Sequence, residues 1–167
     1  MYYLINIGSN LGDRRLNLSR AMAAVMRYWG NIEMSHVVET EPFGFASEHK
    51  FLNVGIMFSS GEDPHEVLRL LQEIERSISP DSHRRSDGSY ADRLIDIDIV
   101  AIDDKVIDDP DLRVPHPHLA ERDFFLVPLE EIAPAWHHPL TGLTPTQMIE
   151  ALPHNTARRT TAAEEGA

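Results

Sequence analysis

Alternating apolar and polar residues predict four strands in this chain. They lie at residues 2–7, 32–40, 51–59 and 94–102, where β-branched and aromatic residues recur. The first strand ends at residues 8–12, Gly-Ser-Asn-Leu-Gly, a composition that favours a turn. A further short strand is expected at residues 105–107.

Helical spacing of apolar residues predicts two helices, at residues 13–30 and 63–80. Asp13 suits the N-terminal cap of the first helix, and Gly30 suits its end. The second begins at Asp63-Pro64 and ends at Ser79-Pro80, because proline fits the first turn of a helix but disfavours its continuation. The expected apolar faces are Leu16, Ala21, Ala24, Val25 and Tyr28 in the first helix and Val67, Leu68, Leu70, Leu71, Ile74 and Ile78 in the second.

The element order β-α-β-β-α-β predicts an α+β fold, a ferredoxin-like split sandwich with helices on one face of an antiparallel sheet. A chain of 167 residues is sufficient for one domain, which we place at residues 1–153. Short helices and proline-punctuated loops are expected at residues 108–152. Residues 154–167 contain no large apolar side chain and are expected to form a disordered tail.

Composition and charge exclude or disfavour several classes of protein function. The net charge of −12 opposes binding of nucleic acid, and no apolar run is long enough to span a membrane. The chain has no cysteine, so disulfides, thiolate nucleophiles and Cys-ligated metals are excluded, and a metal must bind oxygen or imidazole. Because the N-terminus lacks a secretion signal, we expect a cytoplasmic protein.

The clearest chemical signal is the pair Asp96 and Asp98. Alternate side chains of a strand share a face, so both carboxylates project from one face and the neighbouring isoleucines from the other. Carboxylates this close repel each other unless a cation neutralises them, and Mg²⁺ typically takes one or two carboxylates together with substrate phosphates. The alternative is an edge strand with an acidic, solvated face. Arg93 points to the opposite face unless the chain bends before the strand.

Three further features admit two interpretations each. His116, between two prolines, either contacts a phosphate or belongs to a rigid surface turn, and no third ligand completes a zinc site with His118. Arg122 either reaches into a cleft or covers apolar surface with its stem. Residues 8–12 precede a helix, where anions bind, but they lack the Walker A lysine, and a tight structural turn explains them better.

Taken together, these segments resemble the 6-hydroxymethyl-7,8-dihydropterin pyrophosphokinases of folate biosynthesis. The resemblance is collinear over about residues 2–150. It is carried by IGSNLG at residues 7–12, ETEPFG at 39–44, FLN at 51–53, RLIDID at 93–98, VPH at 114–116, and Arg122 with Phe124. It implies a ferredoxin-like fold and an enzyme that transfers pyrophosphate from ATP to the hydroxymethyl group of the reduced pterin, releasing AMP.

The resemblance also implies roles for individual residues. Asp96 and Asp98 would hold two Mg²⁺ ions on the triphosphate of ATP. The phosphates would contact Arg93, Arg122 and His116, and the nucleotide site would be lined by Gln72 and Glu75. The implied pterin pocket comprises Thr40, Phe43, Phe51, Asn53 and Phe124, with two rings sandwiching the heterocycle and Asn53 contacting its polar edge.

The chain departs from this family in the loop before the acidic strand. Residues 80–92 are a few residues longer than usual, and the family's two spaced catalytic arginines correspond to the adjacent Arg84 and Arg85. A catalytically weak or silent relative that binds pterin or nucleotide is therefore the alternative. An RNA-binding module is disfavoured by the acidic charge. The expected partners are the small-molecule substrates alone, and the expected state is a monomer or weak homo-oligomer.

Overall fold

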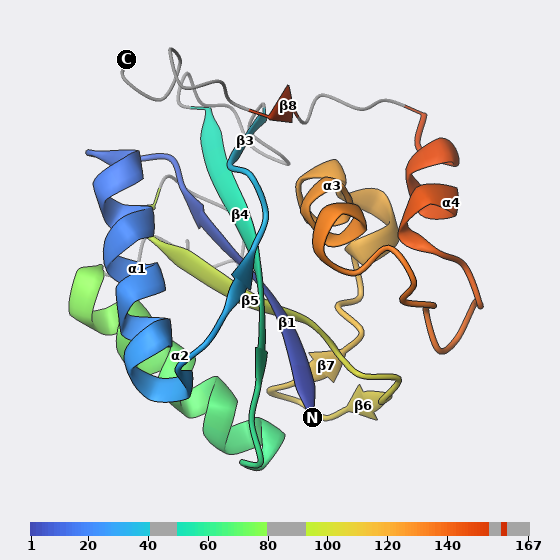
Figure 1. Cartoon of the computed structure of the whole chain (residues 1–167), viewed down its shortest axis with the longest axis horizontal. Coiled ribbons are helices and arrows are strands. Elements are labelled where there is room, and N and C mark those ends of the chain that lie inside the picture. Colours follow the sequence, from blue (N-terminus) through green and yellow to red (C-terminus); the bar gives the residue numbers. More distant parts are fainter. Residues whose placement is uncertain (41–49, 80–92, 154–157, 160–167) are drawn as a thin grey trace.

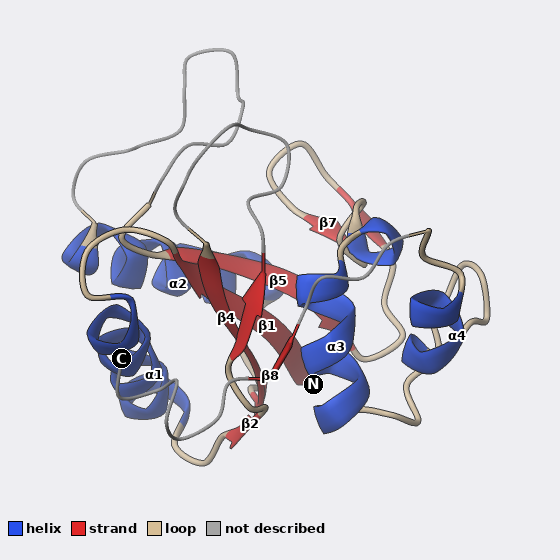
Figure 2. Cartoon of the chain, turned by 90° about the horizontal axis from the view of Figure 1, so that it is seen from above, coloured by secondary structure: helices blue, strands red, loops and turns tan. Residues whose placement is uncertain are grey.

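A central antiparallel sheet separates two groups of helices (Figure 1). The computed structural model describes residues 1–40, 50–79, 93–153 and 158–159. Helices α1 (Arg14–Trp29) and α2 (Pro64–Ile78) cover one face of the sheet. Helix α3 (Asp123–Ile132) covers the other face, with α4 (Pro145–Glu150) against it, and Figure 2 shows the sheet between the two groups.

The main sheet has the strand order β5-β1-β4-β3-β8, and β2 also pairs with β4. Its strands are β1 (Tyr2–Ser9), β2 (Glu33–Met34), β3 (Val38–Thr40), β4 (Phe51–Ser59), β5 (Asp96–Ile102) and β8 (Arg158–Arg159). All these pairings are antiparallel. A separate hairpin of β6 (Ile107–Asp108) and β7 (Arg113–Val114) is followed by a 3-10 helix at Leu119–Glu121. The predicted ferredoxin-like α+β fold is confirmed.

The register of β1 brings distant residues together. Gly8 lies opposite Asn53 on β4 and Asp96 on β5, and Asn6 lies opposite Gly55 and Asp98. Because alternate residues of a strand share a face, these polar positions all belong to one side of the sheet. That side carries α3.

The predicted caps of the two long helices are confirmed, but part of the predicted apolar face of α1 is wrong. Asp13 accepts a hydrogen bond from the amide of Leu16 at 3.1 Å, and Asp63 accepts one from the amide of His65 at 2.9 Å. The side chains of Leu16 and Tyr28 are exposed, by 43% and 48%. Leu16 lies outside the arc of the helix that buries Leu18, Ala21, Ala24 and Val25, whereas Tyr28 lies on that arc but only one residue before the end of α1.

The single strand predicted at residues 32–40 is wrong: the segment divides into β2 and β3. Between them the amide of Ser35 donates to the carbonyl of Gly55 at 2.9 Å, and its Oγ accepts from the amide of Gly55 at 2.9 Å. A side-chain oxygen thus takes the place of a ladder carbonyl, and the amide of His36 then donates to Glu131 of α3. The strand is interrupted there because its backbone groups bond outside the ladder.

Two other boundaries differ from the prediction. The strand predicted to begin at residue 94 begins at Asp96, after a bend, and the short strand expected at 105–107 is Ile107–Asp108. Within the segment predicted as a tail, Arg158–Arg159 pair with β3, while residues 154–157 and 160–167 lie outside the described residues. Among the described residues, no helix has the length and apolarity needed to cross a membrane.

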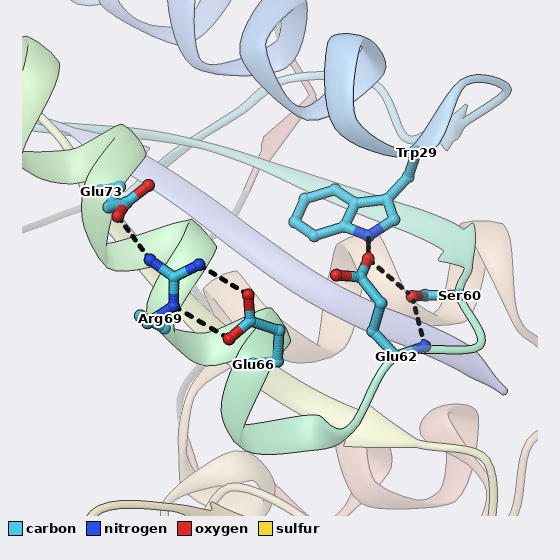
Figure 3. Close-up of polar contacts among 6 residues, drawn as sticks. All are labelled: Trp29, Ser60, Glu62, Glu66, Arg69 and Glu73. Carbon is cyan, nitrogen blue, oxygen red and sulfur yellow. Dashed lines mark hydrogen bonds and ion pairs between the residues drawn. The ribbon is translucent and has the colours of Figure 1, made fainter.

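Each face of the sheet has its own apolar core. Beneath α1 and α2, Phe58 stacks on Tyr3 and Trp29, with ring centroids 5.3 and 4.3 Å away. Trp29 Nε1 also donates to Glu62 Oε1 at 2.9 Å, and Ser60 Oγ donates to the same oxygen at 3.2 Å (Figure 3). This network ties the end of α1 to the turn before α2. The second core packs beneath α3 and α4.

Candidate active site

Asp96 and Asp98 share the face of β5 that turns toward α3. Their side chains are 12% and 24% exposed, and the isoleucines on either side of each are buried on the opposite face. Although β5 is an edge strand of the described sheet, its acidic face lines a pocket and is only partly exposed. The structure therefore has the paired carboxylates that the sequence predicts, in a partly buried setting.

Arg93 is directed toward the acidic pair by the bend before β5. Its guanidinium forms an ion pair with Asp96 and lies 4.0 Å from Glu75 Oε2. The backbone at this point is held by Asn10, whose Oδ1 accepts from the amide of Arg93 at 2.7 Å and whose amide donates to the Arg93 carbonyl at 3.1 Å. A regular strand would have turned Arg93 to the other face, so the bend decides its direction.

The same contacts assign a structural role to the turn at residues 8–12. Besides the two bonds that join Asn10 to Arg93, Asn17 Nδ2 donates to the carbonyl of Leu11 at 3.0 Å. Gly12 has a φ of +69°, a conformation that suits glycine. The turn therefore fixes the start of α1 and the approach to β5, in agreement with the structural interpretation.

Glu75, on α2, contacts the edge strand β5 beside the acidic pair. Its Oε2 accepts from the amide of Ile97 at 3.1 Å. Burial and the neighbouring carboxyl of Asp96 raise the pKa of Glu75 to about 7, against the opposing effects of the Ile97 amide and Arg93. In the metal-free protein Glu75 therefore stays protonated over much of the acidic range.

We expect Glu75 to make the metal-free protein less stable as the pH rises from about 4.5 to about 7. Its folded pKa of about 7 exceeds the model-compound value of 4.5, so the folded state retains a proton that the unfolded chain releases. Glu75→Gln keeps an acceptor for Ile97 but cannot titrate. In urea denaturation with EDTA, the free energy of unfolding of Glu75→Gln, taken relative to that of wild type, should rise as the pH increases across that window. The exposed Glu33→Gln is the control, and a constant gap would contradict the assignment.

His116 lies on the other side of Asp98. Its Nε2 is 3.9 Å from Asp98 Oδ1, and its Nδ1 accepts from the amide of His118 at 3.1 Å. Because Nδ1 is an acceptor, the proton of the neutral ring is on Nε2, the side that faces Asp98. The ring also meets Phe125 edge-on at 4.9 Å between centroids. These contacts orient a donor toward the acidic pair.

The pocket extends from the acidic pair across three strands to α3. It is lined by Asn6, Gly8, Phe51, Asn53, Asp96, Asp98, Phe124 and Phe125. Five of these residues were predicted to belong to the site: Phe51, Asn53, Asp96, Asp98 and Phe124. Asn6 and Phe125 were not, and a polar residue between Ile5 and Ile7 in a buried strand was the only signal for Asn6.

Asn53 and Thr40 have buried polar atoms that suit a ligand. Asn53 Nδ2 and Thr40 Oγ1 have no hydrogen-bond partner within the part of the chain that the structure describes. Buried polar groups normally have partners, and an exception in a pocket indicates a group that the ligand supplies. Asn53 lines the pocket, whereas Thr40, also predicted to contact the pterin, is not among its lining residues. The carboxamide of Asn53 fits here only because residue 8 is glycine: a Cβ there would lie 2.6 Å from Asn53 Oδ1.

Arg122 is buried at the entry to α3, with 4% of its surface exposed. The carbon of its guanidinium lies 5.7 Å from the ring centroid of Phe124 and 5.3 Å from that of Phe125. The aliphatic stem and the guanidinium of Arg122 are thus both buried, whereas an arginine that only covered apolar surface would leave its guanidinium in water.

Gln72 is exposed on α2, outside the pocket lining. Phe43, Arg84 and Arg85 lie outside the described residues.

The donor set fits a hard divalent cation. Asp96 and Asp98 offer carboxylate oxygens side by side, the ligands that Mg²⁺ prefers, and open pocket lies beside them. Within the described ranges, no cluster of three or more His, Asp or Glu side chains suits a metal ion. A cation held by these carboxylates therefore takes its other ligands from water or substrate, as Mg²⁺ does in nucleotide sites.

The ferredoxin-like α+β fold carries a pocket that joins paired carboxylates to aromatic rings and an amide, an arrangement that suits an enzyme which positions a metal-bound phosphate beside a flat ring. Comparison with known protein families identifies the enzyme class. The chain belongs to the 7,8-dihydro-6-hydroxymethylpterin-pyrophosphokinase (HPPK) family, which it matches over residues 4–134. The family and enzyme class predicted from the sequence are confirmed.

Individual relatives agree with this assignment. The 2-amino-4-hydroxy-6-hydroxymethyldihydropteridine pyrophosphokinase of Porphyromonas gingivalis is 41% identical over 138 residues, 81% of this chain and 92% of that protein. A protein of the same name from Aquifex aeolicus is 34% identical, over 81% and 82% of the two chains. The crystal structure of Plasmodium falciparum HPPK-DHPS with SDX-DHP has the same fold, with a TM-score of 0.67 at 16% identity. The match covers 89% of this chain but only 43% of that longer one.

Proposed function

We propose that this chain transfers the pyrophosphoryl group of ATP to the hydroxymethyl group of 6-hydroxymethyl-7,8-dihydropterin and releases AMP. The observation that carries the proposal is one pocket that joins the carboxylates of β5 to Phe51 and Asn53 of β4. The acidic end suits a metal-bound triphosphate, and the aromatic and amide end suits a flat heterocycle with a polar edge. Relatives that bear the name of this activity support the same substrates.

At the acidic end, the residues of this chain hold and neutralise the triphosphate. Asp96 and Asp98 would hold two Mg²⁺ ions, and the bound metal would supply charge neutralisation at the phosphates and a lowered pKa of the pterin hydroxyl. That hydroxyl oxygen attacks the β-phosphorus, the bond from this phosphorus to the bridging oxygen of the α-phosphate breaks, and AMP leaves. Arg93, Arg122 and His116 stabilise the charge that develops on the phosphate oxygens.

Other residues complete the two substrate sites. Arg84 or Arg85 adds positive charge over the phosphates, and Gln72 and Glu75 line the nucleotide side. At the pterin end, Asn53 and Thr40 supply hydrogen bonds from buried atoms that have no partner among the described residues. Phe43, Phe51 and Phe124 supply the stacking rings.

The proposal extends to the domain boundaries, the cellular location and the oligomeric state. We place the enzyme in one domain at residues 1–153 and in the cytoplasm, working as a monomer or weak homo-oligomer on small molecules. The net charge of −12 disfavours a nucleic-acid partner. No separate membrane or protein partner is required for the chemistry.

The test is a coupled measurement of AMP. We expect AMP only when ATP, the hydroxymethyl dihydropterin and Mg²⁺ are all present, because both substrates must occupy the pocket before a bond forms. Omission of each component in turn, and addition of EDTA, are the controls. If the folded protein binds ATP and pterin without forming AMP, the chain is a silent relative. If it binds neither, the proposed substrates are wrong.

A further inference from the structure

The first turn of α3 lacks a backbone donor. In an α-helix the carbonyl of residue 124 accepts from the amide of residue 128. Residue 128 is a proline inside α3, and proline has no amide hydrogen. The carbonyl of Phe124 therefore cannot accept the usual helical hydrogen bond from residue 128, at a point where the helix borders the pocket.

Asn6 of β1 supplies the missing donor. Its Nδ2 donates to the carbonyl oxygen of Phe124 at 2.9 Å. Asn6 is 3% exposed in the middle of the central strand, where its apolar neighbours on either side pack beneath the other face. A buried amide at such a position is costly unless it is hydrogen-bonded, and this bond accounts for it.

Gly55, which pairs with Asn6 in the β1–β4 register, leaves room for Pro128 to pack against the sheet. A Cβ at Gly55 would lie 2.7 Å from Pro128 Cβ, so α3 approaches β4 this closely only because residue 55 is glycine. The two features lie side by side on adjacent strands. Together they set how the first turns of α3 rest on the sheet.

We infer that Asn6 is a positioning residue that places Phe124 in the pterin pocket by replacing the amide hydrogen that Pro128 lacks. The inference rests on the proposed function for the ligand that Phe124 stacks on, but not for the contact itself. Both Asn6 and Phe124 line the pocket. Without the bond, the first turn of α3 would shift to satisfy its carbonyl, and the ring of Phe124 would move with it.

The test is a double-mutant cycle with Asn6→Ala and Pro128→Ala. Asn6→Ala is expected to raise the Kd for the pterin, measured with Mg²⁺ and a nonhydrolysable ATP analogue, by about tenfold, the effect of leaving a buried carbonyl without a donor. The KM for ATP should stay within about twofold, since the bond lies at the pterin end. Pro128→Ala restores an amide hydrogen and retains the Cβ that faces Gly55. The double variant should therefore recover most of the pterin affinity.

A second readout needs no ligand. Hydrogen exchange of the amides of residues 125–127 should quicken in Asn6→Ala and slow again in the double variant. Trp29→Phe, which loses the bond to Glu62 on the far side of the sheet, is the control for general destabilisation and should change neither readout. If Asn6→Ala does not fold, Asn6→Ser replaces it in the cycle.

The outcomes separate this inference from the proposed function. Wild-type protein that binds no pterin refutes the function, while exchange in α3 still decides the role of Asn6. An Asn6→Ala variant with unchanged pterin affinity and unchanged exchange overturns the inference. So does a double variant as impaired as the single one, because Asn6 would then act by touching the pterin directly.

Discussion

Asp98→Ala is expected to abolish AMP formation while the protein stays folded. The carboxylate is one half of the pair proposed to bind Mg²⁺, and losing a metal ligand removes several kcal/mol of charge stabilisation, or about a thousandfold or more in kcat. The melting temperature should change little or rise, because the change relieves repulsion with Asp96 across a partly buried strand face. AMP release and thermal unfolding, measured on the same preparation, test both parts.

Asp104→Ala is the matched control, since Asp104 is an exposed carboxylate in the turn directly after β5. It should keep full activity. Asp98→Asn, of nearly the same shape, separates loss of charge from loss of volume and should be as inactive as the alanine variant. An Asp98→Ala protein that is unfolded would indicate a structural carboxylate, and one with near-normal turnover would remove Asp98 from the catalytic centre.

Gly8→Ala is expected to impair pterin use with little effect on ATP. The added Cβ would lie 2.6 Å from Asn53 Oδ1 and 3.6 Å from a ring carbon of Phe51. Asn53 is 3% exposed on β4, next to the central strand, so its side chain must turn out of place. A shift of about 1 Å in a substrate-positioning group costs about a hundredfold. Steady-state kinetics should therefore show kcat/KM for the pterin falling by about that factor.

Gly61→Ala provides the comparison, because a Cβ at that position would meet no atom of the other described residues within 4 Å, its chain neighbours aside. It should behave as wild type. A Gly8→Ala enzyme whose KM for pterin is unchanged would place the pterin elsewhere. Equal losses for both substrates would instead indicate that the exchange disturbs β1 as a whole.

Local chemistry explains why much of this protein could be predicted. The caps at Asp13 and Asp63 and the proline at residue 64 act within one helical turn, so the sequence alone predicts where the two helices begin. The facing of Asp96 and Asp98 follows from the two-residue repeat of a strand alone. Where the local pattern was overridden, the cause was a contact distant in sequence: Ser35 bonds to Gly55, 20 residues further along the chain, and the predicted strand divides there.

The sequence by itself determined the elements, the fold class, the family and the acidic pair, because each depends on neighbouring residues or on motifs in fixed order. Only the tertiary structure decided that Arg93 turns to Asp96, that the pKa of Glu75 is raised, and that Asn6 donates to a carbonyl in the first turn of α3. These contacts join residues on different elements. They depend on strand register and helix docking, which the energy of the whole packed core sets and which no short stretch of sequence encodes.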